Sequence, residues 1–300
     1  MQHAILGVGG VGGLVGAVLA RAGETVTLIV RPDAVEHYPR ELLLSSRASG
    51  AFSVPVSVTS KLSRPVDVLW VTVKATDLPN ALESFRVTAQ IGTVVPLLNG
   101  IDHVALLRDR FGRDKVVPAT IAVETERIAP GQIVWRSPFA RLNVSSTGRK
   151  LLATTVENLA HFGFDCSFID DENTLMWRKL VFLAPLALST TAANAPIGQI
   201  ISDPPQMIEL RELVLEACAV AVASGAKVDA NVILEVIKSV PAEMRSSMQK
   251  DVEQGKSPEL DAIAGPILRG AESFAISVPI TKRVVQQIEH QLQRATASKV

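Results

Sequence analysis

Two hydrophobic patterns divide the chain near residue 170. Before that point, short apolar runs rich in β-branched residues alternate with helical runs; after it, helical periodicity continues and strand signals disappear. Alternating strands and helices are typical of βαβ units around a buried parallel sheet. We therefore predict an α/β protein with a doubly wound parallel sheet over residues 1–169 and an all-helical domain over residues 170–300. The runs of the first domain are AILGV, LVGAVLARAG, TVTLIV, VDVLWVTV, LPNALESF, TVVPLL, HVALLRDRF and VVPATIAV.

Turn and cap residues delimit the later elements. The segment GQIVWRSPFARLNVSS predicts two antiparallel strands that turn at residues 137–138 and extend the edge of the same sheet. Asp203, followed by two prolines, predicts the start of a helix, and Gly225 predicts its end. Ser257, followed by Pro258, predicts a second helix start.

Composition and charge argue against nucleic-acid binding, a membrane span, a disulfide framework and a metal site. The chain carries 30 basic and 30 acidic side chains, so its charge favours neither nucleic acid nor an anionic membrane as a partner. No uninterrupted run reaches the roughly 20 apolar residues of a membrane span. The two cysteines, Cys166 and Cys218, belong to no CxxC or Cys/His cluster, which indicates neither a disulfide framework nor a metal site. We expect a cytoplasmic protein.

The stretch GVGGVGG follows the first predicted strand and opens the first predicted helix. In the spacing GxGxxG, the first glycine permits the turn, the second admits a pyrophosphate, and the third lets helix and strand pack closely. The helix N-terminus then faces the phosphates. These features predict a Rossmann-type domain with a dinucleotide site; a glycine-rich turn that only packs is the alternative. The predicted cofactor contacts in this loop are Gly7, Val8, Gly9, Gly10, Val11 and Gly12.

The second predicted strand, TLIV, is followed by a cation. An acidic residue here would bind the ribose 2′-hydroxyl of NAD, whereas this chain has Arg31, with Pro32 after it. Because an arginine suits a 2′-phosphate, we predict NADP (NADPH) as the cofactor. A solvated surface arginine is the alternative.

An ordered series of motifs resembles the ketopantoate reductase (2-dehydropantoate 2-reductase) family. The series covers nearly the whole chain: GVGGVGG, Arg31, VTVKATDL at 71–78, LLNG at 97–100, MWRKL at 176–180, and SSM with PELDAIAG in the C-terminal region. The resemblance implies NADPH-dependent reduction of 2-dehydropantoate to pantoate, a step of pantothenate biosynthesis. It also implies a Rossmann domain and a helical domain with the active site between them.

Lys74 and Asn99 follow two predicted strands, VDVLWVTV and TVVPLL. The carboxyl ends of parallel strands are where an open α/β sheet binds its ligand. The resemblance implies cofactor contacts for both residues and a substrate contact for Asn99. A surface lysine and an ordinary Asn-Gly turn are the alternatives.

Lys179 lies on a predicted helix and shares its face with Phe182, Leu183 and Leu186. Burial on an apolar stripe lowers the pKa of a lysine, which then can act as a general acid near neutral pH. Snorkelling of the ammonium to solvent is the alternative. The context WRKL resembles that of the family's catalytic lysine, which implies the same role for Lys179.

Glu259 and Ser247 are further candidates in the C-terminal domain. We expect Glu259 in the first turn after a Ser257 cap, where the helix dipole alone favours a carboxylate. It also leads the face continued by Ile263 and Ile267, which would point it inward. The resemblance implies a catalytic and substrate-binding role for Glu259 and a substrate-binding role for Ser247.

The chain departs from the family one and two helical turns after the lysine. The family has asparagines facing the substrate there, whereas this chain has Leu183 and Ala187. Either other groups, with Asn194, Ser189 or Thr190 as candidates, hold the substrate hydroxyl, or the substrate is a less hydroxylated 2-oxo acid. An apolar site discriminates weakly against such analogues.

These observations predict an NADPH-dependent reductase of a small 2-oxo acid, with 2-dehydropantoate as the family default. A paralogous oxidoreductase acting on another 2-oxo or 2-hydroxy acid, and a non-enzymatic NADP-binding sensor on the same fold, are the alternatives. The sequence leaves the oligomeric state open, a homodimer included.

Overall fold

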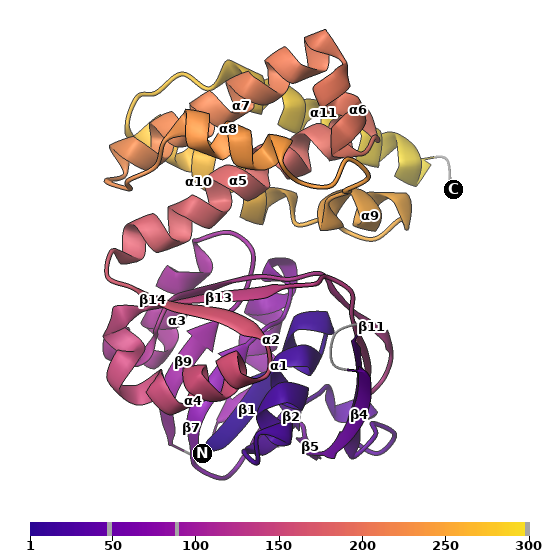
Figure 1. The fold of residues 1–300 in the computed structure, drawn as a ribbon, viewed down its shortest axis with the longest axis vertical. Coiled ribbons are helices and arrows are strands. Elements are labelled where there is room, and N and C mark those ends of the chain that lie inside the picture. Colours follow the sequence, from indigo (N-terminus) through magenta and orange to yellow (C-terminus); the bar gives the residue numbers. More distant parts are fainter. Residues whose placement is uncertain (47–49, 88–89, 298–300) are drawn as a thin grey trace. The chain divides into compact units, whose positions relative to one another are not determined.

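The computed structural model describes residues 1–46, 50–87 and 90–297 (Figure 1). The chain forms two compact units, each described by itself below. One consists of Met1–Leu98 and His103–Leu175, and the other of Asn99–Asp102 and the chain from Met176 onward. The second unit therefore contains four residues that lie far from the rest of it in the sequence.

The first unit is built on a five-stranded sheet in which every pairing is parallel, as the alternating pattern predicts. The strand order β5-β2-β1-β7-β9 grows in one direction from β1 and then in the other. Such a reversal creates a switch point at the carboxyl ends of β1 and β7, where open α/β sheets bind ligands. The bounds are β1 Gln2–Leu6, β2 Thr25–Ile29, β5 Ser57–Thr59, β7 Val66–Val71 and β9 Ile91–Pro96.

Both faces of this sheet are covered, so successive strand residues are buried on opposite sides. In β7, Val68 and Trp70 belong to one hydrophobic core, while Leu69 and Val71 belong to another. Side chains of α1 (Gly10–Arg21) and α4 (Arg149–His161) pack in the first core. Side chains of α2 (Leu78–Ser84) and α3 (His103–Phe111) pack in the second. This is the doubly wound arrangement predicted for the N-terminal domain.

The first unit also contains three smaller sheets among its described residues, and here the predicted pairing is wrong. Of the two strands predicted around residues 137–138, one joins the sheet β11-β12-β3-β4 and the other joins β10-β13-β14. They do not pair with each other, because partners remote in the sequence, β3 and β14, pair in parallel with them instead. The bounds are β3 Glu41–Ser46, β4 Gly50–Pro55, β10 Ala119–Ala122, β11 Thr125–Ala129, β12 Gln132–Trp135, β13 Ala140–Ser145 and β14 Phe164–Ile169, with a short pair β6 Lys61–Leu62 and β8 Arg86–Val87.

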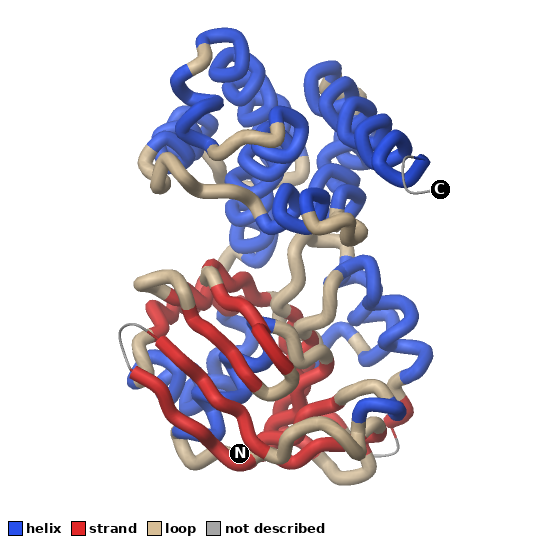
Figure 2. The backbone as a smooth tube through the Cα atoms, turned by 90° about the vertical axis from the view of Figure 1, so that its right-hand side faces the viewer, coloured by secondary structure: helices blue, strands red, loops and turns tan. Residues whose placement is uncertain are grey.

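The chain after β14 is helical throughout the part that the structure describes, as Figure 2 shows by colour. Asp203 caps α7 by accepting a hydrogen bond from the Gln206 amide, and Gly225 (φ +88°) follows the end of that helix, as predicted. The second predicted start is two residues early, because Glu259 rather than Ser257 is the N-cap of α10. The bounds are α5 Glu172–Ala193, α6 Ile197–Ser202, α7 Pro204–Ala223, α8 Ala230–Lys238, α9 Ser247–Glu253, α10 Leu260–Ser273 and α11 Pro279–Ala297. Among the described residues, no helix is both long and apolar enough to span a bilayer.

Candidate functional site

The glycine loop lies at the switch point of the parallel sheet, between the end of β1 and the start of α1. Gly7 has φ +97°, and a Cβ there would stand 2.6 Å from the Val73 amide nitrogen. A Cβ at Gly12 would overlap the Gly7 carbonyl oxygen, whereas a Cβ at Gly9 meets no atom within 4 Å. Two glycines are thus required by packing and one faces open space. This arrangement fits a pyrophosphate held by the first-turn amides of α1, which have no acceptor within the helix.

Two neighbours of the glycine loop escaped the sequence analysis. The Thr72 hydroxyl, just after β7, donates a hydrogen bond to the Gly7 carbonyl oxygen at 2.6 Å and ties the loop to the adjacent strand. Arg127 on β11 donates from Nη1 to the Val8 carbonyl oxygen at 3.1 Å. Thr72 belongs to the quoted stretch VTVKATDL and Arg127 to no quoted motif, but neither contact follows from the sequence, because both depend on which strands become neighbours in space.

The structure places Arg31 and Lys74 in the turns that follow two strands of the parallel sheet. Arg31 is exposed two residues after β2 and precedes a 3₁₀ turn at Pro32–Ala34. Lys74 is exposed three residues after β7, rather than at its end, and precedes a 3₁₀ turn at Ala75–Asp77. Both cations therefore lie on the carboxyl-end side of the sheet, which is the side of the glycine loop.

A hydrogen-bonded chain of three predicted residues lies within the second unit. Lys179 Nζ on α5 donates to Asn99 Oδ1 at 3.1 Å, and Asn99 Nδ2 donates to Glu259 Oε2 at 3.0 Å. Glu259 is 8% exposed, so its side chain is turned inward as the apolar face of its helix predicts. At the N-cap it makes no capping hydrogen bond, which corrects the expectation of a first-turn position.

The segment that carries Asn99 fits closely against α10. Gly100 has φ +81°, and a Cβ there would overlap the Ala262 carbonyl oxygen, so another residue would force the segment away from the helix. The exposed Arg269 guanidinium pairs with Asp102 on this segment and, at 2.7 Å, with Asp261 at the start of α10. These contacts, which the sequence analysis missed, fix the loop after β9 beside the helix that bears Glu259.

Burial changes the acidity of Lys179. Loss of hydration lowers its pKa from 10.5 to about 8, while the negative charge of Glu259 acts in the opposite direction. Near neutral pH the lysine is thus mostly protonated but can release its proton readily. An ammonium of this kind, oriented by an amide and a carboxylate, is suited to general acid catalysis.

The other polar candidates on α5 and α9 are arranged differently. Ser247 is exposed at the first residue of α9, outside the hydrogen-bonded chain of Asn99, Lys179 and Glu259. The preceding Ser246 caps α9, and its hydroxyl lies 2.8 Å from the Thr190 hydroxyl. Thr190 is fully buried and also donates to the Leu186 carbonyl oxygen at 2.8 Å, so its hydroxyl is already engaged.

Four more positions bear on the departure from the family. Leu183 is half-buried against the helical core, and Ala187 is fully buried within it. Asn194 lies exposed at the end of α5 with φ +48°. Ser189 is 4% exposed, and its hydroxyl oxygen has no hydrogen-bond partner among the described residues.

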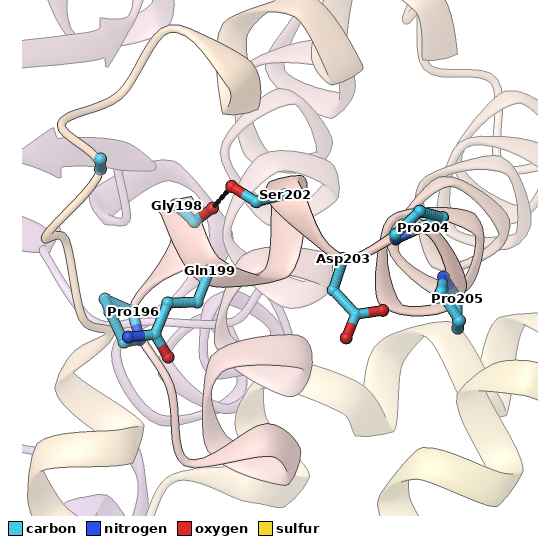
Figure 3. A pocket seen from close by; sticks show the side chains of 8 residues that line it. Pro196, Gly198, Gln199, Ser202, Asp203, Pro204 and Pro205 are labelled. Carbon is cyan, nitrogen blue, oxygen red and sulfur yellow. Dashed lines mark hydrogen bonds between the residues drawn. The ribbon is translucent and has the colours of Figure 1, made fainter.

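A surface depression in the second unit lies where α6 leads into α7 (Figure 3). Its only ionisable side chain is Asp203, which accepts hydrogen bonds from the Gln206 amide and side chain and so serves the helix. None of the predicted site residues lines it. The lining residues are Pro196, Gly198, Gln199, Ser202, Asp203, Pro204, Pro205 and Ala242.

Both cysteines are free thiols, and burial raises the pKa of each to about 11, so they are protonated at neutral pH. No group of three His, Cys, Asp or Glu side chains among the described residues is arranged to hold a metal ion.

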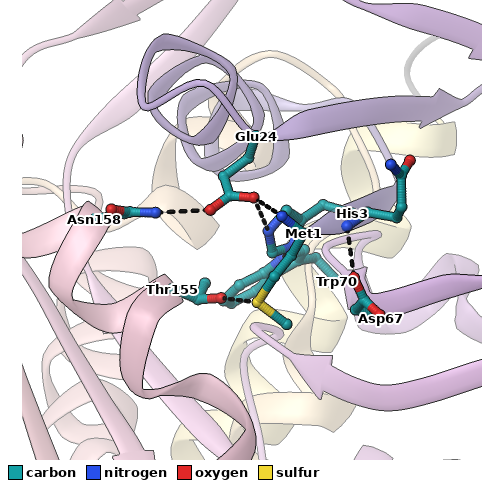
Figure 4. A network of polar contacts seen from close by, with 8 residues as sticks. Met1, His3, Glu24, Asp67, Trp70, Thr155 and Asn158 are labelled. Atoms are coloured by element: carbon teal, nitrogen blue, oxygen red, sulfur yellow. Dashed lines mark hydrogen bonds and ion pairs between the residues drawn. The ribbon is translucent and has the colours of Figure 1, made fainter.

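A second base with a lowered pKa, His3, lies on strand β1 of the first unit, within a network of polar contacts (Figure 4). His3 is 1% exposed, and Trp70 Nε1 donates to its Nδ1 at 3.2 Å. Its Nε2 lies 3.9 Å from Glu24 Oε2, and Glu24 also pairs with the Met1 amino group. Burial lowers the pKa of His3 from 6.5 to about 4, so the ring is neutral at pH 7.

Comparison with known proteins gives matches along both units. Residues 3–148 match the family described as ketopantoate reductase PanE/ApbA, and residues 171–292 match its C-terminal part. A 2-dehydropantoate 2-reductase of Mycobacterium tuberculosis is 30% identical over 291 residues, which cover 94% of this chain and 95% of that protein.

Solved structures agree on the fold. A PanE/ApbA family ketopantoate reductase from Ralstonia eutropha superposes with a TM-score of 0.85 at 26% identity, covering 98% of this chain and 99% of the other. D-mandelate dehydrogenase, solved with NADH and anilino(oxo)acetate, superposes with a TM-score of 0.84 at 18% identity over 98% of this chain and 99% of that one. The matches in both units together show that this chain is an oxidoreductase of the ketopantoate reductase PanE/ApbA family.

Proposed function

We propose that the protein is an NADPH-dependent reductase of a small 2-oxo acid, with 2-dehydropantoate as the first substrate to test and pantoate as its product. The observation that carries the proposal is the chain from Lys179 through Asn99 to Glu259. It joins a lysine with a pKa of about 8 to an amide and a buried carboxylate, groups suited to donating a proton and to binding a keto acid.

Reduction of a keto group needs a hydride at carbon and a proton at oxygen. The nicotinamide cofactor supplies the hydride when bound. Lys179 Nζ donates the proton to the keto oxygen as negative charge develops there, and its ammonium stabilises that charge more in the transition state than in the ground state. Asn99 orients the ammonium through its carbonyl oxygen, and the Glu259 carboxylate favours the protonated lysine. Glu259 and Ser247 bind the substrate's polar groups.

The cofactor proposal depends on backbone and charge in the first unit, together with Asn99 of the second. The loop from Gly7 to Gly12 holds the pyrophosphate, Lys74 and Asn99 contact the nicotinamide half, and Arg31 binds the 2′-phosphate. The test is fluorescence titration with NADPH and NADH. We expect NADPH to bind more tightly, and Arg31→Ala to weaken NADPH by about 1.5–3 kcal/mol while leaving NADH nearly unchanged. Equal affinities of the unmutated protein for the two cofactors would contradict the choice of NADPH.

The second candidate function is reduction of a different, more apolar 2-oxo acid. It is favoured by Leu183 and Ala187, which offer no polar group where the family has asparagines. The family fold does not decide between substrates, since a D-mandelate dehydrogenase shares it. We expect 2-oxoisovalerate, which lacks the hydroxyl of ketopantoate, to compete better than in a relative that carries both asparagines.

A panel of 2-oxo acids assayed with NADPH separates these possibilities. Leu183→Asn is the sharper variant, since Leu183 is only half-buried whereas Ala187 is fully buried. The variant should shift kcat/KM toward ketopantoate, and Val181→Ala, at a fully buried position of the same helix, controls for general disturbance of α5. A strong preference of the unmutated protein for ketopantoate would assign the hydroxyl contacts to other residues. NADPH binding without oxidation by any keto acid would favour the sensor.

A further inference from the structure

Strand β11 lies against the glycine loop of the first unit. Arg127 Nη1 donates to the Val8 carbonyl oxygen at 3.1 Å, and a Cβ added at Gly10 would stand 2.6 Å from the Thr125 carbonyl oxygen. The Thr125 hydroxyl lies 3.1 Å from the Val134 carbonyl oxygen, its nearer acceptor, and 3.4 Å from the Gly10 carbonyl oxygen. Thr125 and Arg127 are two residues apart and so lie on one face of their strand. The strand therefore holds a guanidinium beside the first turn of α1.

The hydrogen bond from Arg127 to the Val8 carbonyl oxygen needs an N–H donor but not a positive charge. A guanidinium has five N–H donors, of which the carbonyl takes one, and a neutral amide side chain could make the same bond. The adjacent Glu126 is bonded to Arg136 at 2.6 Å and points from the other face of β11. In the described part of the chain, Arg127 forms no ion pair with any carboxylate.

We infer that Arg127 is a pyrophosphate-binding residue of the cofactor site, acting together with the first-turn amides of α1. Those amides attract an anion to the loop, and a guanidinium beside Val8 adds a full positive charge with paired donors suited to phosphate oxygens. The inference rests on the proposed function, since it requires a dinucleotide in this loop. It explains why a cation, rather than any hydrogen-bond donor, stands against a carbonyl of the glycine loop.

The test compares Arg127→Gln with Arg136→Gln, a matched loss of an arginine at the end of the neighbouring strand β12. Calorimetric titration measures the binding of NADPH and of adenosine 2′-phosphate, which has no pyrophosphate, and thermal unfolding checks the fold. We expect Arg127→Gln to weaken NADPH about 10- to 150-fold, as for loss of a hydrogen bond to a charged group. The affinity of Arg127→Gln for adenosine 2′-phosphate and its Tm should match those of the unmutated protein. The control Arg136→Gln should bind NADPH as the unmutated protein does. Salt should weaken NADPH binding less in the Arg127→Gln variant than in the unmutated protein.

Failure of the Arg127 inference can be distinguished from failure of the proposed NADPH-dependent function. If the unmutated protein binds NADPH and Arg127→Gln binds it equally well, the inference is wrong and the proposed function stands. Equal weakening of NADPH and adenosine 2′-phosphate would also overturn it, because Arg127 would then only shape the loop. If the unmutated protein binds neither NADPH nor NADH, the proposed function and the inference both fail.

Discussion

His3 in the first unit and Lys179 in the second are both bases whose pKa is lowered by burial, yet their surroundings differ in kind. The pKa of His3 is lowered from 6.5 to about 4, so the ring is neutral at pH 7, and Trp70 donates to its Nδ1. The pKa of Lys179 is lowered from 10.5 to about 8, so the side chain remains mostly protonated at pH 7. Asn99 accepts a hydrogen bond from its Nζ, and Glu259 favours its charged form.

A shifted pKa by itself indicates burial and not function. His3 is buried beside Trp70, a residue of the first hydrophobic core, and the indole N–H of Trp70 donates to its Nδ1. Lys179 is only half-buried, and its neighbours Asn99 and Glu259 are themselves able to bind a substrate. A pKa close to the working pH, together with polar neighbours that can contact a ligand, distinguishes a candidate acid from a structural base.

The largest expected effect follows from removing the candidate acid. General acid catalysis contributes typically about 100- to 10,000-fold, so Lys179→Ala should lower kcat by about that factor while NADPH affinity changes little. Lys179→Arg should not restore the rate, because guanidinium does not release a proton near neutral pH. Stopped-flow NADPH oxidation with the preferred 2-oxo acid measures the rate, and fluorescence titration measures the affinity. A near-normal kcat in Lys179→Ala would make Lys74 the next candidate and would remove the distinction from His3.

The corresponding test of His3 measures stability. The unfolded chain binds a proton at His3 below pH 6.5, whereas the folded protein does so only near pH 4, so the free energy of unfolding should fall as pH drops through this window. The lowered pKa corresponds to a loss of about 3 kcal/mol of unfolding free energy at the acid end of this window, at roughly 1.36 kcal/mol per pKa unit. Above pH 6.5 His3 is neutral in both states and causes no such loss. Glu24, Asp67 and the Met1 amino group are the charges that act on the ring, with opposing signs.

Denaturant unfolding of the unmutated protein and of His3→Gln at pH 4 to 7 isolates this contribution, because glutamine keeps an acceptor for Trp70 and does not titrate. Their difference in unfolding free energy should change across the window, whereas kcat per folded molecule should be similar at pH 7. Parallel pH profiles of stability would show that His3 takes up its proton equally in both states.

A smaller effect compares two glycines of the first unit. Gly12→Ala brings a methyl group onto the Gly7 carbonyl oxygen and should lower the free energy of unfolding by about 1–3 kcal/mol, as overpacking does. Gly9→Ala meets no protein atom within 4 Å and should leave Tm unchanged while weakening NADPH, whose pyrophosphate needs that space. Thermal unfolding and NADPH titration measure the two quantities. Unchanged NADPH affinity in Gly9→Ala would place the cofactor elsewhere.

The smallest expected effect concerns the charge beside Lys179. Because the reduction needs protonated lysine, kcat/KM should fall about tenfold per pH unit above roughly pH 8. Glu259 is the smaller of the two influences on this pKa and raises it, so Glu259→Gln should move the alkaline limb to lower pH. Steady-state kinetics between pH 6 and 10 measure the limb. An unmoved limb in Glu259→Gln, with activity retained, would assign it to another group.

The sequence alone predicted the parts of this protein that are set by residues close together in the chain. The parallel sheet, the glycine loop between β1 and α1, the capped start of α7 and the helical second half all follow from periodicity, turn chemistry and capping within a few residues. The inward direction of Glu259 also followed from helical periodicity, although its cap position did not.

Contacts between segments that are distant in the sequence depend on how the whole chain packs. Asn99 lies 80 residues from Lys179 and 160 from Glu259, and the motifs implied their roles but not that they form one hydrogen-bonded chain. The partners of β12 and β13, and the contact of Arg127 with Val8, were likewise beyond local patterns. Local preferences act over a few residues, whereas the choice among distant partners is made by packing of the whole core, which no segment of the sequence specifies by itself.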